Sequence, residues 1–477
     1  MHFCLSLSAE KFNMSLIKSI SGIRGTIGGQ PNDALTPLDI VKFAAAYAAW
    51  LVNRQGGKAA GKKVVVGRDG RISGPFVKDI VARTLNMSGL DVVDVDLSTT
   101  PTVEMAVVWE NALGGIIITA SHNPKEWNAL KLLNEKGEFL SAADGEALLA
   151  LVDSEAYRFV SVDQLGTWTK RTDAIQQHVK TVLDYPLVKK EEIKARNFKI
   201  VVDGVNSTGS IAVPQLLEAL GIKKENIIVI NKEITGNFAH NPEPLPDNLT
   251  ELRSEVDKQK ADLGIAVDPD VDRLCFVCED GSMFGEEFTL VAVADYILHH
   301  KKGPTVSNLS STRALRDVTE KHGCQYYPSA VGEVNVVEKM KEVDAVIGGE
   351  GNGGVIVPDF HYGRDALIGV ALFLSHLASR KSARQLRAEY PEYFISKNKI
   401  ELLPSVDLKK VFEHIQEKYK KDNINTIDGL KIEFDKDWVH LRPSNTEPII
   451  RIYAESGFET TADNIAKRIM QDIKECM

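Results

Sequence analysis

Apolar and polar positions alternate along the chain in blocks that predict strands and helices in turn. Short β-branched runs predict buried strands at residues 63–66, 92–95 and 115–118, and longer mixed stretches predict helices at 39–52 and 74–87. The strand–turn–helix unit starts again at residues 198–202 and once more after Met283. This repetition predicts mixed sheets that are covered by helices on both faces.

The C-terminal part of the chain follows a different pattern. Closely spaced strands are predicted at residues 431–434, 438–441 and 449–453, and a helix follows at 462–474. We therefore expect an α/β protein whose mixed sheets are sandwiched by helices, with a smaller α+β C-terminal domain. The predicted division is a disordered extension at 1–13 with Met14 as the natural start, α/β domains at 14–170, 171–282 and 283–394, and the α+β domain at 395–477.

Composition narrows the classes of function. With 477 residues the chain is too long for one core, and its 43% hydrophobic and 26% charged residues are ordinary for a globular protein. A net charge of −9 is opposite to the basic character that nucleic-acid-binding proteins show. Five scattered cysteines predict no disulfide framework, and no apolar run reaches the length of a membrane helix. We expect a cytoplasmic protein that binds neither nucleic acid nor membrane.

One segment carries a serine suited to hold a phosphoryl group. Residues 119–124 read TASHNP and follow a predicted strand, so Ser121 lies where the strand gives way to a loop. A serine hydroxyl needs a nearby base or metal to act as a nucleophile. His122 and Lys131 are close enough along the chain to be candidates for the base. Taken alone, the segment is equally typical of an ordinary turn.

An acidic cluster follows another predicted strand, at residues 261–267. If this segment is extended, Asp268, Asp270 and Asp272 point the same way and their carboxylates converge. Such carboxylates repel one another unless a cation neutralises them, and all-oxygen ligands beside a phosphate substrate favour Mg²⁺. A solvated acidic turn is one alternative. An EF-hand loop is another, but it needs a glycine and a glutamate at fixed positions.

Two further polar loops are candidate binding segments. The glycine-rich run at 348–354 offers Glu350 and Asn352, which suit hydrogen bonds to vicinal sugar hydroxyls, although glycine-rich turns are common. The segment 442–448 suits a phosphate dianion, and a capped surface turn is its alternative. Its candidate phosphate-binding residues are Arg442, Ser444, Asn445 and Thr446.

These four segments, in this order, resemble the α-D-phosphohexomutase superfamily of phosphoglucomutases, phosphomannomutases and phosphoglucosamine mutases. They read TASHNP, DPDVDR, GGEGNGG and RPSNTEP, and the resemblance covers the chain from about Leu16 onward. The combination is far more specific than any one segment. It implies three related α/β domains and a distinct fourth domain around a central active site.

The resemblance also implies a role for each matching residue. Ser121 is similar to the serine that is phosphorylated in the active enzyme, sharing one Mg²⁺ with Asp268, Asp270 and Asp272. Lys131 falls at the family's distance after the serine and is a general acid/base candidate. The other matches are Arg24 facing the phosphoserine, Arg273 closing the metal loop, Glu350 contacting sugar hydroxyls, and Arg442, Ser444, Asn445 and Thr446 holding the non-reacting phosphate.

Two positions depart from the family pattern. Many bacterial relatives have serine where this chain has Asn352. Some relatives carry a lysine or histidine in the loop that here contains Glu333, so no acid/base role is transferred to that site.

The implied activity is that of an isomerase of the phosphohexomutase class. Phosphoserine 121 gives its phosphoryl group to a hexose monophosphate, and the resulting 1,6-bisphosphate, also the activator, turns over and returns a phosphoryl group. The GEGNGG form favours phosphoglucosamine mutase, which converts glucosamine 6-phosphate to glucosamine 1-phosphate. Alternatives are a phosphomannomutase or phosphoglucomutase with the same mechanism, a serine-dependent sugar phosphatase, and a non-catalytic sugar-phosphate-binding protein. The oligomeric state is left open.

Overall fold

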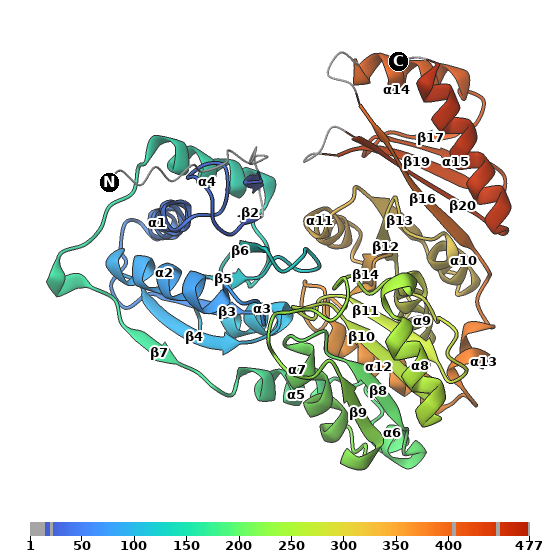
Figure 1. Cartoon of the computed structure of the whole chain (residues 1–477), viewed down its shortest axis with the longest axis horizontal. Coiled ribbons are helices and arrows are strands. Elements are labelled where there is room, and N and C mark those ends of the chain that lie inside the picture. Colours follow the sequence, from blue (N-terminus) through green and yellow to red (C-terminus); the bar gives the residue numbers. More distant parts are fainter. Residues whose placement is uncertain (1–14, 20–21, 403–406, 445–448, 476–477) are drawn as a thin grey trace, which may run out of the picture.

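A computed structural model of the chain describes residues 15–19, 22–402, 407–444 and 449–475. The extension predicted at 1–13 and the predicted phosphate-binding residues Asn445 and Thr446 lie outside the described residues. Figure 1 shows the four sheets in chain order, with the N-terminal domain on the left and the C-terminal domain at the upper right.

The N-terminal domain contains a seven-stranded mixed sheet with helices on both faces. Its strands are β1 (Ile17–Ser19), β2 (Gly22–Thr26), β3 (Lys63–Arg68), β4 (Asp91–Leu97), β5 (Gly114–Ile118), β6 (Trp127–Leu133) and β7 (Trp168–Lys170). Its helices are α1 (Pro37–Arg54), α2 (Gly74–Met87), α3 (Thr100–Trp109) and α4 (Ala142–Ser154). The order is β1-β2-β6-β5-β3-β4-β7, with β5, β3, β4 and β7 parallel. Apolar residues of α1, α2 and α4 pack on one face and those of α3 on the other.

The second sheet has four strands in the order β11-β10-β8-β9. They are β8 (Ile200–Asp203), β9 (Ile227–Ile230), β10 (Leu263–Val267) and β11 (Leu274–Cys278), surrounded by α5 (Ala174–Asp184), α6 (Lys190–Arg196), α7 (Gly209–Ala219) and α8 (Thr250–Gln259). The antiparallel pairing of β10 with β11 brings the chain back on itself, so the acidic segment between them forms a tight connection at the edge of the sheet.

The third sheet also has four strands, in the order β13-β12-β14-β15. They are β12 (Thr305–Asn308), β13 (Tyr326–Ser329), β14 (Ile347–Glu350) and β15 (Gly354–Ile356). The accompanying helices are α9 (Glu286–His300), α10 (Ala314–Lys321), α11 (Glu333–Val343), α12 (Ala366–Ala378) and α13 (Ala383–Arg387).

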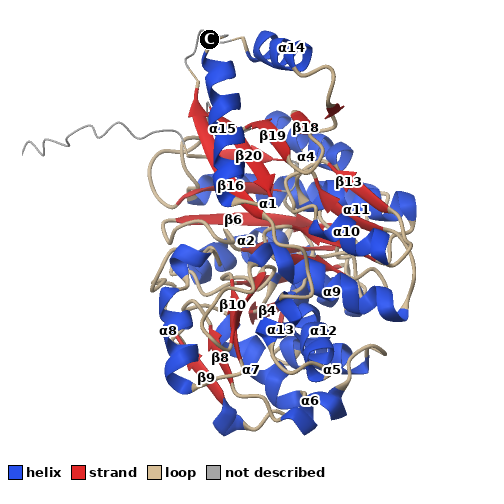
Figure 2. Cartoon of the chain, turned by 90° about the vertical axis from the view of Figure 1, so that its right-hand side faces the viewer, coloured by secondary structure: helices blue, strands red, loops and turns tan. Residues whose placement is uncertain are grey.

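The C-terminal domain is an antiparallel sheet with helices on one side (Figure 2). Its strands are β16 (Phe394–Glu401), β17 (Asn423–Asn425), β18 (Leu430–Glu433), β19 (Trp438–Pro443) and β20 (Ile449–Ser456), and its helices are α14 (Leu408–Lys418) and α15 (Glu459–Lys474). The predicted fold class, three α/β units and a smaller α+β unit, is confirmed.

The second and third sheets share a hydrophobic core. Phe276 of β11 stacks on Phe373 of α12 with 3.8 Å between ring centroids, and Phe284 packs edge-on against Phe373 at 5.0 Å. The C-terminal domain, in contrast, has an apolar cluster of its own, which includes Ile432, Leu441 and Ile469. The middle of the chain is therefore one packing unit, while the C-terminal domain is separate from it.

The glycine-rich segment differs from its prediction. The apolar residues Ala345, Val346 and Ile347 predict a strand with a loop after it, but of these only Ile347 lies in β14, which runs into the glycines and ends at Glu350. A Cβ at Gly348 would lie 2.5 Å from the sulfur of Met340 on α11, so glycine permits helix and strand to approach closely there. In the described part of the chain, no helix has the length and apolar character needed to cross a membrane.

Candidate active site

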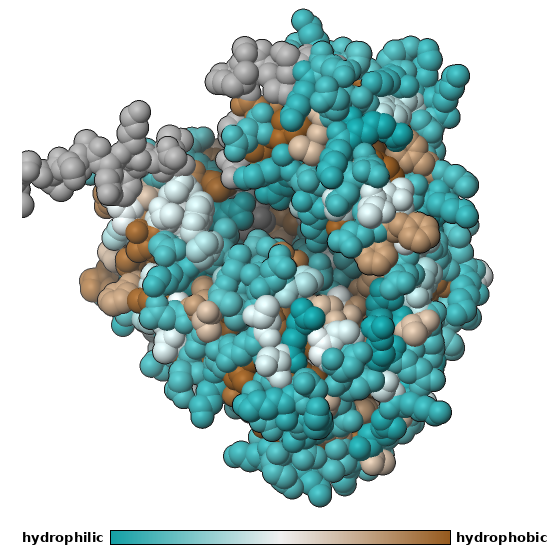
Figure 3. Space-filling model, turned by 45° about the vertical axis from the view of Figure 1, so that its right-hand side comes forward, coloured by the Kyte–Doolittle hydropathy of each residue, from teal (hydrophilic) through white to brown (hydrophobic). Residues whose placement is uncertain are grey.

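A cleft of about 1000 Å³ lies between loops of all four domains. The space-filling view shows a hollow below the upper lobe, on a predominantly hydrophilic face (Figure 3). Most predicted site residues line this cleft: Arg24, His122, Lys131, Arg273, Glu350, Asn352 and Arg442. Although the protein has a net charge of −9, basic side chains gather in the cleft, which suits an anionic ligand.

Ser121 lies in the loop after β5, in a left-handed backbone conformation with φ of 48°. Its hydroxyl donates a hydrogen bond of 2.7 Å to Oδ2 of Asp268, and Nδ1 of His122 lies 3.4 Å from Oγ of Ser121. Thr119 fixes the loop from behind, because its Oγ1 accepts a 2.9 Å hydrogen bond from the Ser121 amide. The loop therefore presents the Ser121 hydroxyl directly to the acidic segment of the second domain.

Arg71, which sequence reasoning missed, holds this loop in place. Its guanidinium donates to the carbonyl oxygens of Ser121 at 2.5 Å, Asn123 at 2.6 Å, Pro124 at 2.7 Å and Trp127 at 2.9 Å. The side chain of Arg71 is wholly buried, and so is that of Asp69, with which it forms an ion pair.

Asp69 is the counter-charge of this buried arginine. Its Oδ2 accepts from Nε of Arg71 at 3.0 Å and from the hydroxyl of Thr119 at 2.7 Å. One carboxylate thereby fixes both the arginine and the threonine that support the Ser121 loop. The available sequence signal was a polar Asp-Gly-Arg turn between a strand and a helix, the position at which α/β proteins place functional loops.

The three aspartates converge, but not because the segment is extended. Val271 adopts a left-handed φ of 62°, so the chain turns between β10 and β11. Oδ1 of Asp268 accepts hydrogen bonds from the amides of Asp272 and Arg273, both at 3.1 Å, which closes the turn. The predicted period-two geometry was wrong, and the turn brings the carboxylates together instead.

Contacts from the first domain support the same turn. The Thr100 hydroxyl donates to Oδ2 of Asp270 at 2.6 Å, and the Thr100 amide donates to the Asp270 carbonyl at 2.8 Å. From within the second domain, the hydroxyls of Ser207 and Thr208 both donate to the Pro269 carbonyl. The acidic turn is thus held by two domains.

The donor set of this cluster fits a hard divalent cation. Carboxylate oxygens of Asp268, Asp270 and Asp272 lie within 4.8 Å of one another, and all three residues are fully buried. Among the described residues, Oδ1 of Asp270 and Oδ1 of Asp272 have no hydrogen-bond partner. Burial raises the pKa of Asp268 well above its usual range, and the neighbouring Asp272 and Asp270 add to the rise. A cation among these oxygens would satisfy the orphaned acceptors and relieve the repulsion.

Lys131 and Arg364 provide partial compensation for the acidic charge. Nζ of Lys131 lies 2.7 Å from Oδ2 of Asp270 and 3.3 Å from Oδ2 of Asp272. Burial opposes the charged form, but the attraction of the two aspartates outweighs it and raises the pKa of Lys131. The ammonium group of Lys131 is thus held against the acidic cluster, where it makes an electrostatic contact with both carboxylates.

Arg364 links the metal-site aspartates to the sugar-binding segment. Its guanidinium donates to Asp272 Oδ2 at 2.7 Å, to Glu350 Oε2 at 2.8 Å and to Glu333 Oε2 at 3.0 Å. It was missed because these partners lie far away along the chain. Asn352 also donates to Oε2 of Glu350, at 3.3 Å. Hydrogen bonds from several directions therefore orient the Glu350 carboxylate. Burial opposes the ionisation of Glu350, but the positive charge of Arg364 outweighs burial and lowers the pKa of Glu350.

The predicted phosphate-binding end is built on β19 and β20. Nε of Arg442 forms an ion pair of 2.9 Å with Asp428, and the Ser444 amide donates to the Ile449 carbonyl at 2.9 Å. Arg451 lines the cleft beside them and was also missed. Strand alternation could have found it, because residues 450 and 452 are buried in the domain core while 451 lies on the opposite face.

The remaining predicted residues surround the serine with positive charge. Arg273 pairs with Glu243 at 2.9 Å. Burial, with a contribution from Arg451, lowers the pKa of Arg24. Burial, together with Arg273, lowers the pKa of His122 well below its usual range, so its imidazole is neutral near pH 7.

Models of one protein family match along the whole chain. The phosphoglucomutase/phosphomannomutase alpha/beta/alpha domains I, II and III match residues 16–159, 176–281 and 286–393, and the C-terminal domain of the same family matches 402–472.

Individual relatives agree. The chain is 37% identical to a phosphoglucomutase/phosphomannomutase of Thermococcus kodakarensis, over 92% of this chain and 95% of the relative. It is 32% identical to a phosphoglucosamine/phosphogalactosamine mutase of Sulfurisphaera tokodaii, over 97% and 100%. The crystal structure of a phosphoglucomutase/phosphomannomutase family protein from Burkholderia thailandensis superposes with a TM-score of 0.82 at 25% identity, covering 98% of both chains. An N-acetylphosphoglucosamine mutase of Aspergillus fumigatus, in complex with GlcNAc-6P and magnesium, shares the fold with a TM-score of 0.57 at 14% identity, over 91% and 97%.

Proposed function

We propose a phosphohexomutase activity for this chain, which belongs to the phosphoglucomutase/phosphomannomutase family. The observation that carries the proposal is the position of the Ser121 hydroxyl, 2.7 Å from Asp268 beside two orphaned carboxylate oxygens. This arrangement faces a cleft whose far end carries Arg442 and Arg451. We infer that the phosphoryl carrier and the cation site would lie beside this cleft, at the end lined by His122, and that a second anion would bind at the end lined by Arg442.

Asp268, Asp270 and Asp272 would hold Mg²⁺ together with an oxygen of phosphorylated Ser121. The cation supplies charge neutralisation for the transferring phosphoryl group. The burial of the three carboxylates and their orphaned oxygens support this assignment.

Phosphoryl transfer depends on how the protein positions its groups. Ser121 releases the phosphoryl group as the Oγ–P bond breaks, and the substrate hydroxyl forms the new O–P bond and loses its proton. His122, neutral and next to the serine, is a candidate acceptor for that proton, and Lys131 is a candidate donor to Ser121 Oγ. Arg24 and Arg273 would stabilise charge on the equatorial oxygens. Arg71 fixes the serine loop throughout, so that the reacting atoms stay aligned.

Substrate binding must serve two orientations of one sugar. Glu350 and Asn352 would contact sugar hydroxyls, while Arg442 and Ser444, together with the predicted Asn445 and Thr446, would hold the phosphate that is not reacting. The 1,6-bisphosphate intermediate then turns in the cleft and returns a phosphoryl group to Ser121. A volume of about 1000 Å³ supports this reorientation, because it exceeds the volume that a hexose bisphosphate fills.

We propose glucosamine phosphate as the sugar, with mannose and glucose phosphates as the alternative substrates of the same mechanism. The GEGNGG form of the sugar loop motivates this choice. The relatives' names include both phosphoglucosamine and phosphomannose mutases, so a direct comparison of substrates is required.

The test is ³¹P NMR of the protein with Mg²⁺, a catalytic trace of hexose 1,6-bisphosphate and glucosamine 1-phosphate. We expect a glucosamine 6-phosphate signal to grow without release of inorganic phosphate. If mannose or glucose 1-phosphate is converted instead, the proposed mutase activity stands and the proposed substrate is wrong. Inorganic phosphate as the product would identify a serine-dependent phosphatase, and no reaction with any of the sugars would favour a non-catalytic binding protein.

A further inference from the structure

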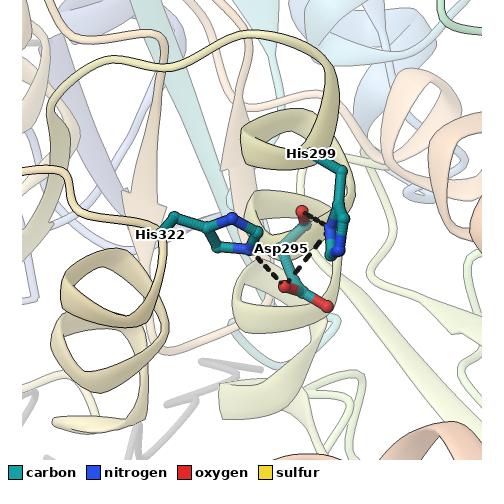
Figure 4. Close-up of side chains that lie close together, drawn as sticks. All are labelled: Asp295, His299 and His322. Atoms are coloured by element: carbon teal, nitrogen blue, oxygen red, sulfur yellow. Dashed lines mark hydrogen bonds and ion pairs between the residues drawn. The ribbon is translucent and has the colours of Figure 1, made fainter.

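A cluster of one aspartate and two histidines lies in the third domain, among residues that do not line the cleft (Figure 4). Asp295 and His299 are one turn apart on α9, and His322 follows the end of α10. Nε2 of His322 lies 2.7 Å from Oδ1 of Asp295, and Nδ1 of His299 lies 3.6 Å from the same oxygen. The three side chains point toward one another across the gap between the two helices.

The histidines of this cluster have defined hydrogen-bond roles. Nδ1 of His299 lies 2.7 Å from the Asp295 carbonyl, so it donates there and Nε2 keeps its lone pair. Nδ1 of His322 accepts from the ammonium group of Lys302 at 2.8 Å, so its Nε2 carries the proton that Asp295 accepts. Nδ1 of His299 is thus engaged with the helix backbone, Nε2 is the ring nitrogen left for an ion, and the side chain is 54% exposed.

A third histidine faces the same carboxylate from α12. Nδ1 of His376 lies 3.2 Å from the Ala292 carbonyl and donates to it, which leaves a lone pair on Nε2. That nitrogen is 3.9 Å from Oδ2 of Asp295, too far for a hydrogen bond. Two acceptors thus face each other inside the domain, because His376 is 3% exposed and Asp295 is 4% exposed. A cation between them would bind the lone pair of His376 and the carboxylate oxygen that also accepts from Tyr390.

The support around Asp295 is typical of a metal ligand. Its Oδ2 accepts a hydrogen bond of 3.2 Å from the hydroxyl of Tyr390, which fixes the orientation of the carboxylate. The ligand atoms of Asp295, His299 and His322 lie within 4.8 Å of one another. Small shifts of the side chains would bring them to the spacing of about 3.3 Å that ligands about 2.1 Å from a tetrahedral ion require.

We propose that Asp295, His299 and His322 form a second metal site that binds a borderline transition-metal ion of the Zn²⁺ class, with His376 available as a fourth ligand. Ligation through Nε2 of His322 requires the ring proton to shift from Nε2 to Nδ1, which replaces the hydrogen bond that Nδ1 accepts from Lys302, so the neutral imidazole binds the ion and no net proton is released. Imidazole and carboxylate ligands together suit Zn²⁺, whereas the all-oxygen cluster in the cleft suits Mg²⁺. The ion would join α9 to the end of α10 and thereby stabilise the domain that carries Glu350.

The test is isothermal titration of the full-length protein with Zn²⁺ in the presence of excess Mg²⁺, which occupies the aspartates of the cleft. We expect one Zn²⁺ per chain in the wild type. His299→Gln and His322→Gln should each weaken binding by about tenfold or more, and Tyr390→Phe by about tenfold through the orientation of Asp295. Substituting Co²⁺ for Zn²⁺ should give visible absorption bands that disappear in the histidine variants.

His300→Gln is the matched control. It is the next histidine on α9 and its Nδ1 likewise faces a backbone carbonyl, that of Tyr296 at 2.9 Å, but it is not part of the Asp295, His299 and His322 cluster, so its Zn²⁺ binding should match the wild type. Absence of Zn²⁺ binding to the wild type would overturn the proposal, as would unchanged binding in both histidine variants, which would place the ion elsewhere. If His322→Gln fails to fold, Zn²⁺ binding by His299→Gln tests the proposal, because the His299 side chain is half-exposed and its substitution is compatible with folding. Zn²⁺ binding is measured independently of mutase activity, so a protein that binds no Zn²⁺ would contradict this proposal without affecting the proposed function.

Discussion

The two ends of the cleft are built in different ways. At the Ser121 end, the side chains of Arg71 and Asp69 are both 0% exposed, and the acidic turn is held by hydrogen bonds from the first and second domains. At the opposite end, Arg442 is 23% exposed and pairs with Asp428 within the C-terminal domain. One end is a buried polar network, and the other is a basic surface on a domain with its own core.

Polar contacts join the C-terminal domain to the rest of the molecule. Ser310 lies 2.9 Å from Nδ1 of His440, and the Val331 amide donates to Asp428 at 2.9 Å. Such contacts can break and re-form at less cost than a packed core. The comparison teaches that the Ser121 end is held by a buried polar network, while the Arg442 end belongs to a domain joined to its neighbour by polar contacts, which suits the proposed binding of two different phosphates there.

The largest effect is expected at the centre of the buried end. Ser121→Ala removes the phosphoryl carrier, so kcat should fall by about 10⁴-fold or more in a steady-state mutase assay. The matched control is Ser310→Ala, which removes a hydroxyl on the other side of the same cleft and should cost about fivefold at most. Equal losses in the two variants would contradict the role of Ser121.

Arg71→Ala tests whether the serine loop depends on its buried arginine. The change leaves Asp69 buried without its counter-charge, so unfolding free energy should fall by about 3–5 kcal/mol, measured by urea denaturation. The loop carbonyls also lose their donors, and we expect kcat to fall about 100-fold with a smaller change in KM.

Arg68→Ala is the control, because Arg68 is the last residue of β3, the strand that precedes Arg71. Arg68 pairs with Asp96, which is 46% exposed, so its loss should cost about 1 kcal/mol or less. If Arg71→Ala were as stable and active as this control, the loop would be rigid without its arginine.

Arg442→Ala tests the exposed end of the cleft. Loss of a charged hydrogen-bond donor to the non-reacting phosphate should lower kcat/KM by about 10- to 100-fold. Phosphorylation of Ser121, measured by intact-protein mass spectrometry, should be unchanged because the serine loop is not touched. Arg316→Ala provides the comparison, since Arg316 pairs with Glu433 of the C-terminal domain but does not line the cleft. Unchanged turnover in Arg442→Ala would remove the phosphate-binding assignment.

The smallest effect concerns acid sensitivity at the loosely attached end. Burial, reinforced by Lys431, lowers the pKa of His440 from 6.5 to about 4, although the Asp428 carbonyl opposes the shift. Between these values the unfolded chain binds the proton and the folded protein does not, so stability falls as the pH drops from about 6.5 toward 4. From pH 7 to 5 this histidine should cost about 2 kcal/mol.

The measurement is the change in Tm between pH 7 and pH 5 for the wild type and for His440→Gln. The variant should lose less, while its mutase activity at pH 7 stays within about fivefold of the wild type. An identical pH response would show that His440 protonates freely in the folded protein.

The local pattern of apolar and polar residues predicted many helices and strands and the loops that carry the motifs. The helix expected at 74–87 coincides with α2, and the strand expected at 115–118 lies within β5. Both are specified by apolar periodicity and boundary residues within the segment itself. The strand predicted before Glu350 begins later than expected, at Ile347, where β14 pairs with β12 and β15 and Gly348 lies close to Met340 of the neighbouring helix α11.

The sequence by itself determined the fold class, the family and the segments that supply the serine, the acidic cluster and the basic loop, because each of these is encoded in contiguous residues. Tertiary structure alone decided how the segments meet. The Asp268–Asp272 segment turns through a left-handed Val271, and Arg71 and Arg364 bind partners about 50 and 92 positions away. Hydrogen bonds and ion pairs of this range depend on which loops the packed sheets bring together, and no local pattern of residues records that.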